Sequence, residues 1–390
     1  MIKIEDKKNC SGCGACANAC PTNAIKMSRD SFGFAYPEVD ESLCVKCGKC
    51  VATCPIITPA KAGDPRRVIG AKNKNESVRS KSSSGGTFYE LAKGVISRGG
   101  IVYGCALDSE LVARHVGVET LDDLARLKSS KYVQSDVGET YREVKKHLKD
   151  GREVLYSGTP CQIAGLKNYL GCEYEGLLLV DVLCHGVPSP GVFADYLEHL
   201  ADKFGSKPVS VNFRNKEKSW KRLYFEVKLE NGKRYFTFCG YDRYMSMFLN
   251  NISLRPSCYD CRFTSVNRQG DITLGDFWGI GRRYPERDDD KGISLIILNT
   301  PKGEKAYGEI SDSLSAFDSE IDIAAAGQRT LTAPTKKNPK HDIFYALYAE
   351  KGVKYAVDSV TDIPSAPKRA YYALRRWGLD LVRKILRKGY

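Results

Sequence analysis

The sequence has no apolar run long enough to cross a membrane. Its most apolar stretch covers residues 176–183, is much shorter than a membrane-spanning helix and contains Asp181. The N-terminal residues, MIKIEDKKNC, also lack the features of a secretory signal peptide. These two absences predict a cytoplasmic protein.

Nucleic-acid-binding motifs are absent as well, although the formal net charge is +13. Positive charge without such a motif argues against nucleic acid and leaves an acidic protein, an anionic cofactor or an anionic membrane surface as partners. No catalytic triad or pair of carboxylates is evident either. An enzyme whose cofactor performs the difficult chemistry needs few such groups, so this absence fits a cofactor-dependent reaction.

Cysteine, in contrast, is abundant: the chain has 15 and no export signal, which favours metal binding over disulfides. Eight of them form two runs of the pattern C-x₂-C-x₂-C-x₃-C-P, which is typical of bacterial ferredoxins with two [4Fe–4S] clusters. In such domains the fourth cysteine of each run binds the opposite cluster. We therefore predict one cluster on Cys10, Cys13, Cys16 and Cys54, and the other on Cys44, Cys47, Cys50 and Cys20.

Two alternatives exist for these eight cysteines, a zinc site and a disulfide framework. Neither requires two identical runs that each end in proline, so both are disfavoured. Gly12, Gly14 and Gly48 let the backbone approach the clusters closely, and amide N–H groups there can donate hydrogen bonds to sulfur. Low-potential clusters within reach of solvent further suggest an anaerobic setting.

The chain is long enough for two or three domains, of which the ferredoxin domain takes residues 1–60. A proline-rich linker ends near Arg67, and short apolar runs then alternate with helical segments such as residues 87–97 and 138–149. This alternation predicts an α/β domain, with some α+β elements and a substantially parallel sheet, over residues 68–363. In its more β-rich part, Asn231-Gly232 predicts a hairpin.

A third region, residues 364–390, is predicted to form a basic amphipathic helix. Leu374, Trp377 and Leu381 recur at helical spacing, and the arginines and lysines lie largely off that stripe. We expect this helix to dock on the α/β domain with its basic face in solvent. The alternative is peripheral contact of residues 368–390 with an anionic surface on the inner face of the membrane.

Four cysteines of the second domain can converge on a further cluster. Cys161 follows a strand at a helix start, where a thiolate is stabilised, and Cys184 lies just past the next strand, at the edge where parallel sheets bind ligands. Cys258 and Cys261 form a CxxC pair near another strand. From spacing alone, a third [4Fe–4S] cluster competes with a catalytic dithiol, a zinc site and buried structural cysteines. The cysteines that belong to no spaced motif, and for which core packing is expected, are Cys105, Cys172 and Cys239.

A serine- and glycine-rich segment, residues 82–92, leads into a predicted helix, where backbone N–H groups bind phosphate or simply form a cap. Its sequence SSGGTFYELA, with KYVQSDVG, SGTPCQIAGL, LCHGVPSP, CYDCRFT and DITLGDFWG, resembles the coenzyme F420 hydrogenase/dehydrogenase beta-subunit family, including its chlorophyll-reductase relatives. The resemblance covers residues 68–340, and an N-terminal ferredoxin pair is a common fusion in that family.

The resemblance implies an α/β flavoprotein that binds FAD and a [4Fe–4S] cluster and passes electrons between clusters, flavin and a hydride-accepting partner. The residues that match its flavin-side segments are Ser83, Ser84, Gly85, Gly86, Thr87, Lys131, Tyr132, Gln134 and Ser135. The residues that match its cluster ligands are Cys161, Cys184, Cys258 and Cys261. His185 is a candidate catalytic proton relay, although a histidine beside a cluster ligand is more often structural.

We therefore expect an iron–sulfur flavoprotein oxidoreductase whose clusters exchange electrons with FAD, and whose acceptor or donor is a small molecule or a deazaflavin such as coenzyme F420. A redox partner protein or ferredoxin-type donor is expected. Two alternatives remain: a non-enzymatic electron-transfer subunit of a larger hydrogenase or dehydrogenase, and an accessory protein for surface-polysaccharide synthesis held at the membrane by the basic tail. No motif identifies the substrate.

Overall fold

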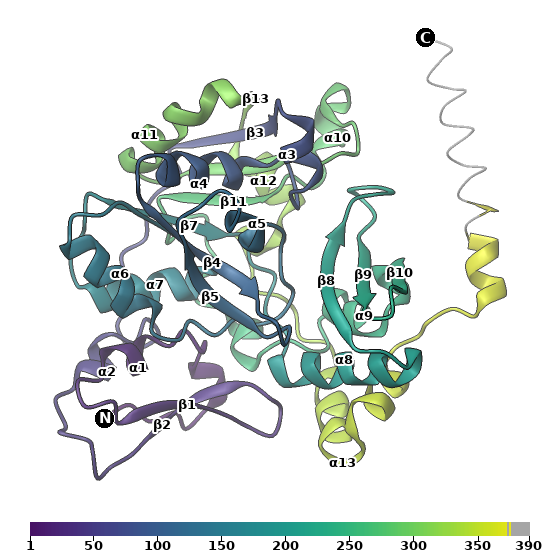
Figure 1. The fold of residues 1–390 in the computed structure, drawn as a ribbon, viewed down its shortest axis with the longest axis horizontal. Coiled ribbons are helices and arrows are strands. Elements are labelled where there is room, and N and C mark those ends of the chain that lie inside the picture. Colours follow the sequence, from purple (N-terminus) through teal and green to yellow (C-terminus); the bar gives the residue numbers. More distant parts are fainter. Residues whose placement is uncertain (373, 376–390) are drawn as a thin grey trace.

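The computed structural model describes residues 1–372, 374 and 375, which form a small N-terminal domain, a large α/β domain and a smaller sheet beside it (Figure 1). The N-terminal domain consists of β1 (Ile25–Arg29), β2 (Ala35–Val39), α1 (Ala15–Ala19) and α2 (Lys49–Ala52). Each helix begins directly after a glycine in the left-handed region, with φ of 72° at Gly14 and 75° at Gly48. Other residues adopt this conformation only at a cost, which explains these glycines in the two cysteine runs.

An eight-stranded sheet forms the centre of the large domain, in the order β13-β3-β12-β11-β7-β6-β4-β5. Its strands are β3 (Arg67–Asn73), β4 (Ile101–Leu107), β5 (Ala113–Val118), β6 (Val154–Gly158), β7 (Leu177–Val182), β11 (Ile272–Asp276), β12 (Ser294–Leu298) and β13 (Leu314–Ser319). The run β4-β6-β7-β11 is parallel, whereas β5, β12, β3 and β13 pair in antiparallel fashion. The α/β fold is confirmed, but the prediction of a substantially parallel sheet holds only for its centre.

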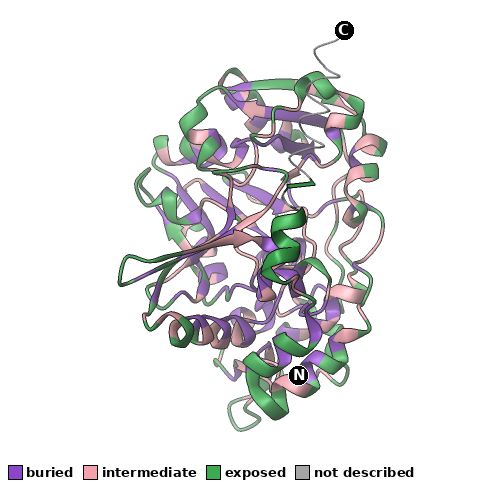
Figure 2. Ribbon diagram, turned by 90° about the vertical axis from the view of Figure 1, so that its right-hand side faces the viewer, coloured by how far each residue is buried: buried purple, intermediate pink, exposed green. Residues whose placement is uncertain are grey.

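Helices cover both faces of this sheet. α4 (Thr87–Ser97) and α11 (Pro301–Ile310) contribute to the core on one face, and α6 (Thr140–Lys149) and α7 (Pro160–Leu170) to the core on the other. The central strands are consequently buried, while the outer helices and loops remain exposed (Figure 2). The predicted helices over residues 87–97 and 138–149 are confirmed. The remaining short helices of the domain are α3 (Glu76–Ser80), α5 (Leu124–Leu127), α10 (Ile280–Arg283) and α12 (Ile321–Gly327).

A three-stranded antiparallel sheet with the order β10-β9-β8 lies beside the large sheet (Figure 1). This part comprises β8 (Pro208–Asn215), β9 (Tyr224–Leu229), β10 (Arg234–Phe238), α8 (Pro190–Phe204), α9 (Arg243–Leu249) and α13 (Lys340–Val360), which is kinked at Gly352. The predicted hairpin joins β9 to β10, and Gly232 in its turn has a φ of 80°. The sequence Asn231-Gly232 thus forms the expected tight turn.

The N-terminal domain packs directly on the rest of the protein. Cys13 and Ala15 join the core formed by α6, α7 and the central strands, while Phe34 joins the core around α8, α9 and α13. A Cβ atom on Gly33 would lie 2.6 Å from the Cα atom of Gly191, so the two backbones touch there. These contacts fix the position of the cysteine-rich domain relative to the large sheet.

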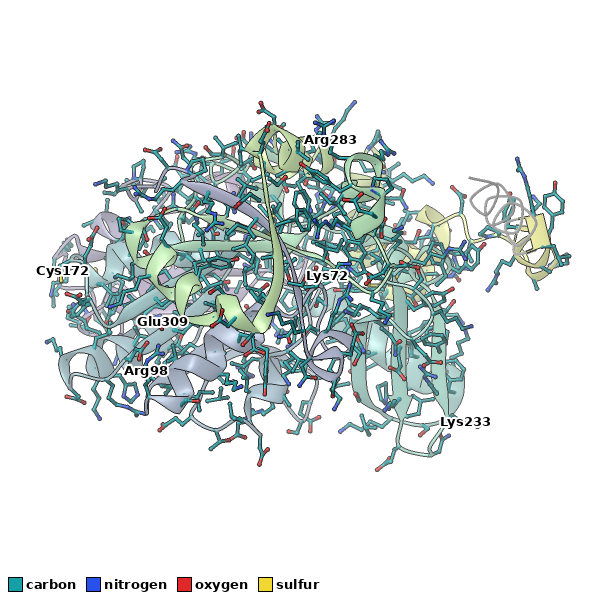
Figure 3. All side chains as sticks on the ribbon, turned by 90° about the horizontal axis from the view of Figure 1, so that it is seen from above. Lys72, Arg98, Cys172, Lys233, Arg283 and Glu309 are labelled. Carbon is teal, nitrogen blue, oxygen red and sulfur yellow. The ribbon has the colours of Figure 1, made fainter. Side chains whose placement is uncertain are left out.

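The three cysteines without a motif lie in different environments. Cys239 is fully buried, as expected, and Cys105 lies half-buried against the core around α8 and α9. Cys172 is exposed at the edge of the molecule (Figure 3), so the expectation of core packing is wrong for it. The reason is local: Gly171, with a φ of 74°, ends α7, and Cys172 therefore falls in the surface loop that follows.

The predicted C-terminal helix lies mostly outside the described residues, which omit 373 and 376–390. Residues 366–372 are helical, and Leu374 is 69% exposed. Docking of the whole helix on the protein and its contact with a membrane both stay predictions. Among the described residues, no helix combines the length and the apolar character that crossing a membrane requires.

Candidate iron–sulfur and cofactor site

The eight N-terminal cysteines gather into two pockets, and each pocket takes its fourth cysteine from the other run. The inner ferredoxin pocket is lined by Cys10, Cys13, Cys16 and Cys54. The outer ferredoxin pocket is lined by Cys20, Cys44, Cys47 and Cys50. These are the two ligand sets that the sequence pattern predicts for a pair of cubanes.

The environment of the sulfur atoms fits negatively charged clusters. The backbone N–H of Ala24 donates a hydrogen bond to Cys20 Sγ, and that of Ile2 donates to Cys50 Sγ, both at 3.2 Å. Burial raises the pKa of Cys16 to about 12. A thiolate at this position therefore needs a strong positive partner such as iron, because burial favours the neutral thiol.

A second set of four cysteines comes together in the large domain; we call Cys161, Cys184, Cys258 and Cys261 the third cysteine group. Burial raises the pKa of the Cys184 thiol, and the charges of the other three members raise it further, which places all four within electrostatic reach of one another. Thr159 caps α7 with a capping box, and its hydroxyl lies 3.1 Å from Cys161 Sγ. The predicted convergence of these four residues is therefore present.

The inner ferredoxin pocket and the third cysteine group are neighbours. The charge of Cys161 also raises the pKa of Cys13, whose first cause is burial. A Cβ atom on Gly165 of α7 would lie only 3.0 Å from Cys13 Sγ, so this helix approaches the ferredoxin domain closely. Among the described residues, no group of three or more His, Cys, Asp or Glu side chains has the geometry to hold a single metal ion. A cubane requires a different geometry, because each of its cysteines binds a separate iron atom.

A cavity of about 600 Å³ opens at the carboxyl ends of β6, β7 and β11, beside the third cysteine group. Cys161 and Cys184 belong to its lining. Its size lies within the range of small-molecule and cofactor sites, and its place at the carboxyl ends of parallel strands is where such folds bind ligands. A molecule in this cavity would lie directly next to the cysteine group.

All but one of the residues predicted to hold a flavin line this cavity. The lining residues from that set are Ser83, Ser84, Gly86, Thr87, Lys131, Tyr132, Gln134 and Ser135. Gly85 does not line it, because it packs against the sheet: its N–H donates to Ser294 Oγ at 3.0 Å, and a Cβ atom would lie 2.2 Å from the Ala71 carbonyl oxygen. Gly85 thus shapes the loop rather than touching what the cavity holds.

Thr87, the first residue of α4, lines the cavity. The residue is 1% exposed, and its Oγ1 atom is buried with no hydrogen-bond partner among the described residues. Phe88 and Tyr89 also line the cavity, and the N–H groups of these first residues of the helix have no carbonyl one turn earlier within the helix to receive them. An anionic or hydroxyl-rich ligand would satisfy these donors.

The second segment predicted to hold the flavin, residues 131–135, makes contacts with several different parts of the protein. Lys131 Nζ donates to the carbonyl oxygens of Arg126 and Lys128 at 2.9 and 2.8 Å, and burial lowers its pKa to about 8. Gln134 instead reaches the ferredoxin domain, where its Nε2 donates to the Ser11 carbonyl oxygen at 3.0 Å. Gln134 therefore links the cavity wall to the inner ferredoxin pocket, which its sequence motif does not reveal.

A buried ion pair at the cavity was not predicted. Arg214 of β8 donates to Asp276 Oδ2 at 2.6 Å and to the Tyr132 hydroxyl at 2.9 Å, and its guanidinium lies over the Trp278 ring. The motif DITLGDFWG contains both Asp276 and Trp278 and could have marked this place, but Arg214 belongs to no motif. The pair connects β8 to the large sheet at the edge of the cavity.

His185 lines the cavity as well, with its ring held by neighbours. Its Nε2 lies 2.7 Å from Asn251 Oδ1, and its ring packs edge-on against Phe248. Burial lowers its pKa, so the ring stays neutral in the folded protein at neutral pH. A role for His185 in proton transfer stays a proposal.

His115, also at the cavity, makes the protein sensitive to acid. Burial lowers its pKa from 6.5 to about 4, and its ring nitrogens lie 3.0 Å from Ser135 Oγ and from the Ser157 carbonyl oxygen. Between these pH values the unfolded chain binds a proton that the folded chain does not, so stability falls as the pH falls. Between pH 7 and pH 5 this residue should remove about 2 kcal/mol from the free energy of unfolding.

Urea unfolding of the wild type and of His115→Gln at the two pH values measures this loss. The variant should show a smaller loss on going from pH 7 to pH 5, because glutamine does not titrate there. Equal losses in both proteins would contradict the assignment to His115.

Comparison with known proteins agrees with this geometry. Residues 9–56 match the family model described as 4Fe-4S dicluster domain, so the protein is an iron–sulfur electron-transfer protein. Residues 151–318, which include the third cysteine group, match the family model for the C terminus of the coenzyme F420 hydrogenase/dehydrogenase beta subunit. The chain thus joins a ferredoxin-type segment to a segment that matches this beta-subunit family model, and the resemblance seen in the motifs is confirmed.

One solved structure with detectable similarity is a chain of the F420-reducing [NiFe] hydrogenase complex from Methanosarcina barkeri, in a xenon derivative. The alignment has 16% sequence identity and a TM-score of 0.45, and it covers 77% of this chain and 92% of that chain. No curated protein matches the chain.

Proposed function

We propose that this protein is a flavin-dependent oxidoreductase that passes electrons between a redox partner protein and a small-molecule acceptor, with a deazaflavin such as coenzyme F420 as the leading candidate. Its cavity would hold FAD, and the third cysteine group would hold a third [4Fe–4S] cluster. When bound, the clusters would carry single electrons and the flavin would exchange a hydride with the acceptor.

The observation that carries this proposal is the order of the cysteines through the molecule. The outer ferredoxin pocket includes the exposed Cys47, the inner ferredoxin pocket contacts α7 through Cys13, and Cys161 of the third cysteine group lies in the first turn of that helix. Cys161 and Cys184 then open on the cavity. Twelve thiols thereby form a continuous series from the surface to a ligand site.

The outer end of this series has the features of a docking site for an electron-transfer protein. Leu43 and Val45 are 50% and 62% exposed beside Cys47, and Lys46 and Lys49 are exposed next to them. Apolar contact surrounded by positive charge suits an acidic partner such as a ferredoxin-type donor. The residues around Cys47 would bring the partner close to the outer ferredoxin pocket.

The direct test is anaerobic purification followed by measurement of flavin, iron and sulfide, and then of turnover with candidate acceptors. We expect one flavin per chain and reduction or oxidation of a small molecule by the isolated protein. Bound flavin without turnover by the isolated chain would instead favour the electron-transfer subunit of a larger complex. Protein without flavin would overturn the proposal.

Thr87→Val tests the flavin site at one atom. Valine keeps the shape of threonine and removes a hydroxyl that has no protein partner among the described residues, so the apoprotein should be as stable as the wild type or slightly more stable. If FAD uses this hydroxyl, the dissociation constant for FAD should rise about fivefold to tenfold, corresponding to about 1 kcal/mol. Fluorescence titration of the apoprotein with FAD measures the affinity.

Thr140→Val is the matched control. Its Oγ1 is also buried, but it donates to the Val137 carbonyl oxygen at 2.7 Å and lies 3.0 Å from the Tyr156 hydroxyl. This variant should therefore lose about 1 kcal/mol of stability and keep its affinity for FAD. The opposite pattern in the two variants would remove Thr87 from the flavin site.

A further inference from the structure

Arg255 is the feature that the proposed function leaves unexplained. It is fully buried, with 0% of its surface exposed, and it precedes the short helix Pro256–Asp260 that carries Cys258. Burying a guanidinium charge is costly unless an opposite charge lies nearby. A negatively charged group is therefore expected next to Arg255.

The other buried arginines each have a carboxylate. The pairs are Arg79 with Asp289 at 2.6 Å, Arg214 with Asp276 at 2.6 Å and Arg268 with Asp181 at 3.3 Å. Arg255 makes no ion pair in the part of the chain that the structure describes. It thus departs from the rule that the other buried arginines follow.

The guanidinium of Arg255 points at the inner ferredoxin pocket instead. Its Nε donates to the Cys10 carbonyl oxygen at 2.8 Å, one terminal nitrogen donates to the Ala35 carbonyl oxygen at 2.9 Å, and that nitrogen also lies 3.6 Å from Cys10 Sγ. The other terminal nitrogen donates to Gln134 Oε1 at 3.0 Å. A Cβ atom on Gly12 would lie 2.8 Å from this second nitrogen, so the glycine leaves the space that the arginine occupies.

Arg255 also borders the third cysteine group. The backbone N–H of Cys258 donates to the Arg255 carbonyl oxygen at 2.9 Å. Gln134, which accepts from the Arg255 guanidinium, lines the cavity together with Cys161 and Cys184. One buried cation therefore lies against Cys10 of the inner ferredoxin pocket and next to elements that carry the third cysteine group.

We propose that Arg255 is a positioning residue for electron transfer. Its fixed positive charge lies against the inner ferredoxin pocket, and its backbone contacts Cys258 of the third cysteine group, so that it stabilises the reduced state of the clusters held at both. A [4Fe–4S] cluster with four thiolates is negatively charged and gains one more negative charge on reduction, so a nearby cation raises its reduction potential. The part of this inference that concerns the third cysteine group rests on the proposed function, whereas the part that concerns the inner ferredoxin pocket does not.

The test is a redox titration of anaerobically purified protein, monitored by electron paramagnetic resonance, on the wild type and on Arg255→Gln. Glutamine keeps a hydrogen-bond donor and removes the charge. At a fixed potential, the ratio of reduced to oxidised cluster should fall about tenfold or more for two clusters, and stay unchanged for the one in the outer ferredoxin pocket. Iron content is measured in parallel to show that the clusters are assembled.

Two further variants keep the test decisive. Arg255→Lys retains the charge and should keep the midpoint potentials near those of the wild type. This variant can still be measured if Arg255→Gln fails to assemble its clusters. Arg262→Met removes an exposed charge whose guanidinium donates to the Ile56 carbonyl oxygen beside the inner ferredoxin pocket at 2.9 Å, and water should screen its loss. Unchanged potentials in Arg255→Gln, equal shifts in Arg262→Met, or a shift in Arg255→Lys as large as expected for glutamine would each overturn the proposal.

The outcomes for Arg255 and for the proposed function are separable. A protein that holds no flavin but shows the shift at the inner ferredoxin pocket would support the role of Arg255 and refute the flavin enzyme. An active protein that contains flavin, and whose midpoint potentials do not change in Arg255→Gln, would support the flavin enzyme and refute the role of Arg255.

Discussion

Replacing Cys258 and Cys261 together by alanine should lower the iron content from about twelve to about eight atoms per chain, because one cubane of three would be lost. The two residues supply half of the third cysteine group, and two remaining thiols cannot hold a cubane. Iron and sulfide determination on anaerobically purified protein, with protein concentration from amino-acid analysis, measures the change. Electron transfer from the ferredoxin domain to the cavity should be lost with the cluster.

The matched control replaces Cys172 and Cys239 by alanine. Neither residue belongs to one of the three cysteine sets, although one is exposed and the other buried, so the iron content should stay at about twelve. If the variant lacking Cys258 and Cys261 also kept about twelve irons, or if the wild type contained only about eight, the third cluster would be excluded. Neither result would argue against clusters in the two ferredoxin pockets.

Much of the fold can be predicted from the sequence because its local signals are strong. Helix α4 begins at Thr87 and ends at Ser97, as its apolar spacing indicates, and Asn231-Gly232 turns the chain between β9 and β10. The direction of a strand within the sheet cannot be predicted in this way, because an apolar run such as residues 294–298 has the same pattern in a parallel and in an antiparallel strand. Whether β12 runs parallel or antiparallel to β11 depends on the path of the chain between them, which carries no periodic signal.

The same distinction applies to the site. The exchange of Cys20 and Cys54 between the two pockets could be predicted because the repeated C-x₂-C-x₂-C-x₃-C-P pattern is typical of ferredoxins in which the fourth cysteine of each run binds the opposite cluster. Arg255 and Arg214 could not be found in this way. A single arginine belongs to no spaced pattern, so its role can be inferred only from the residues that surround it in the folded protein.

Replacing Arg214 by methionine should lower the free energy of unfolding by about 3–5 kcal/mol, because Asp276 would remain buried without its cation. The arginine side chain is 2% exposed and that of Asp276 14%, so water compensates for little of the loss. Arg214 also holds the Tyr132 hydroxyl at the cavity, so bound flavin should decrease in the same variant. Urea unfolding under anaerobic conditions and flavin content measure the two effects.

Arg67→Met is the control for this experiment, since Arg67 pairs with Asp318 at 2.7 Å but both side chains are about half exposed or more, at 49% and 68%. Solvent screens this pair, and its loss should cost less than about 1 kcal/mol. The double variant Arg214→Met with Asp276→Leu adds the sharper test. It removes both charges, so it should recover part of the stability that the single variant loses, although Trp220 Nε1 also loses its acceptor at Asp276. If the double variant were no more stable than Arg214→Met, the loss would come from packing around the guanidinium, and the unpaired carboxylate would not be its cause.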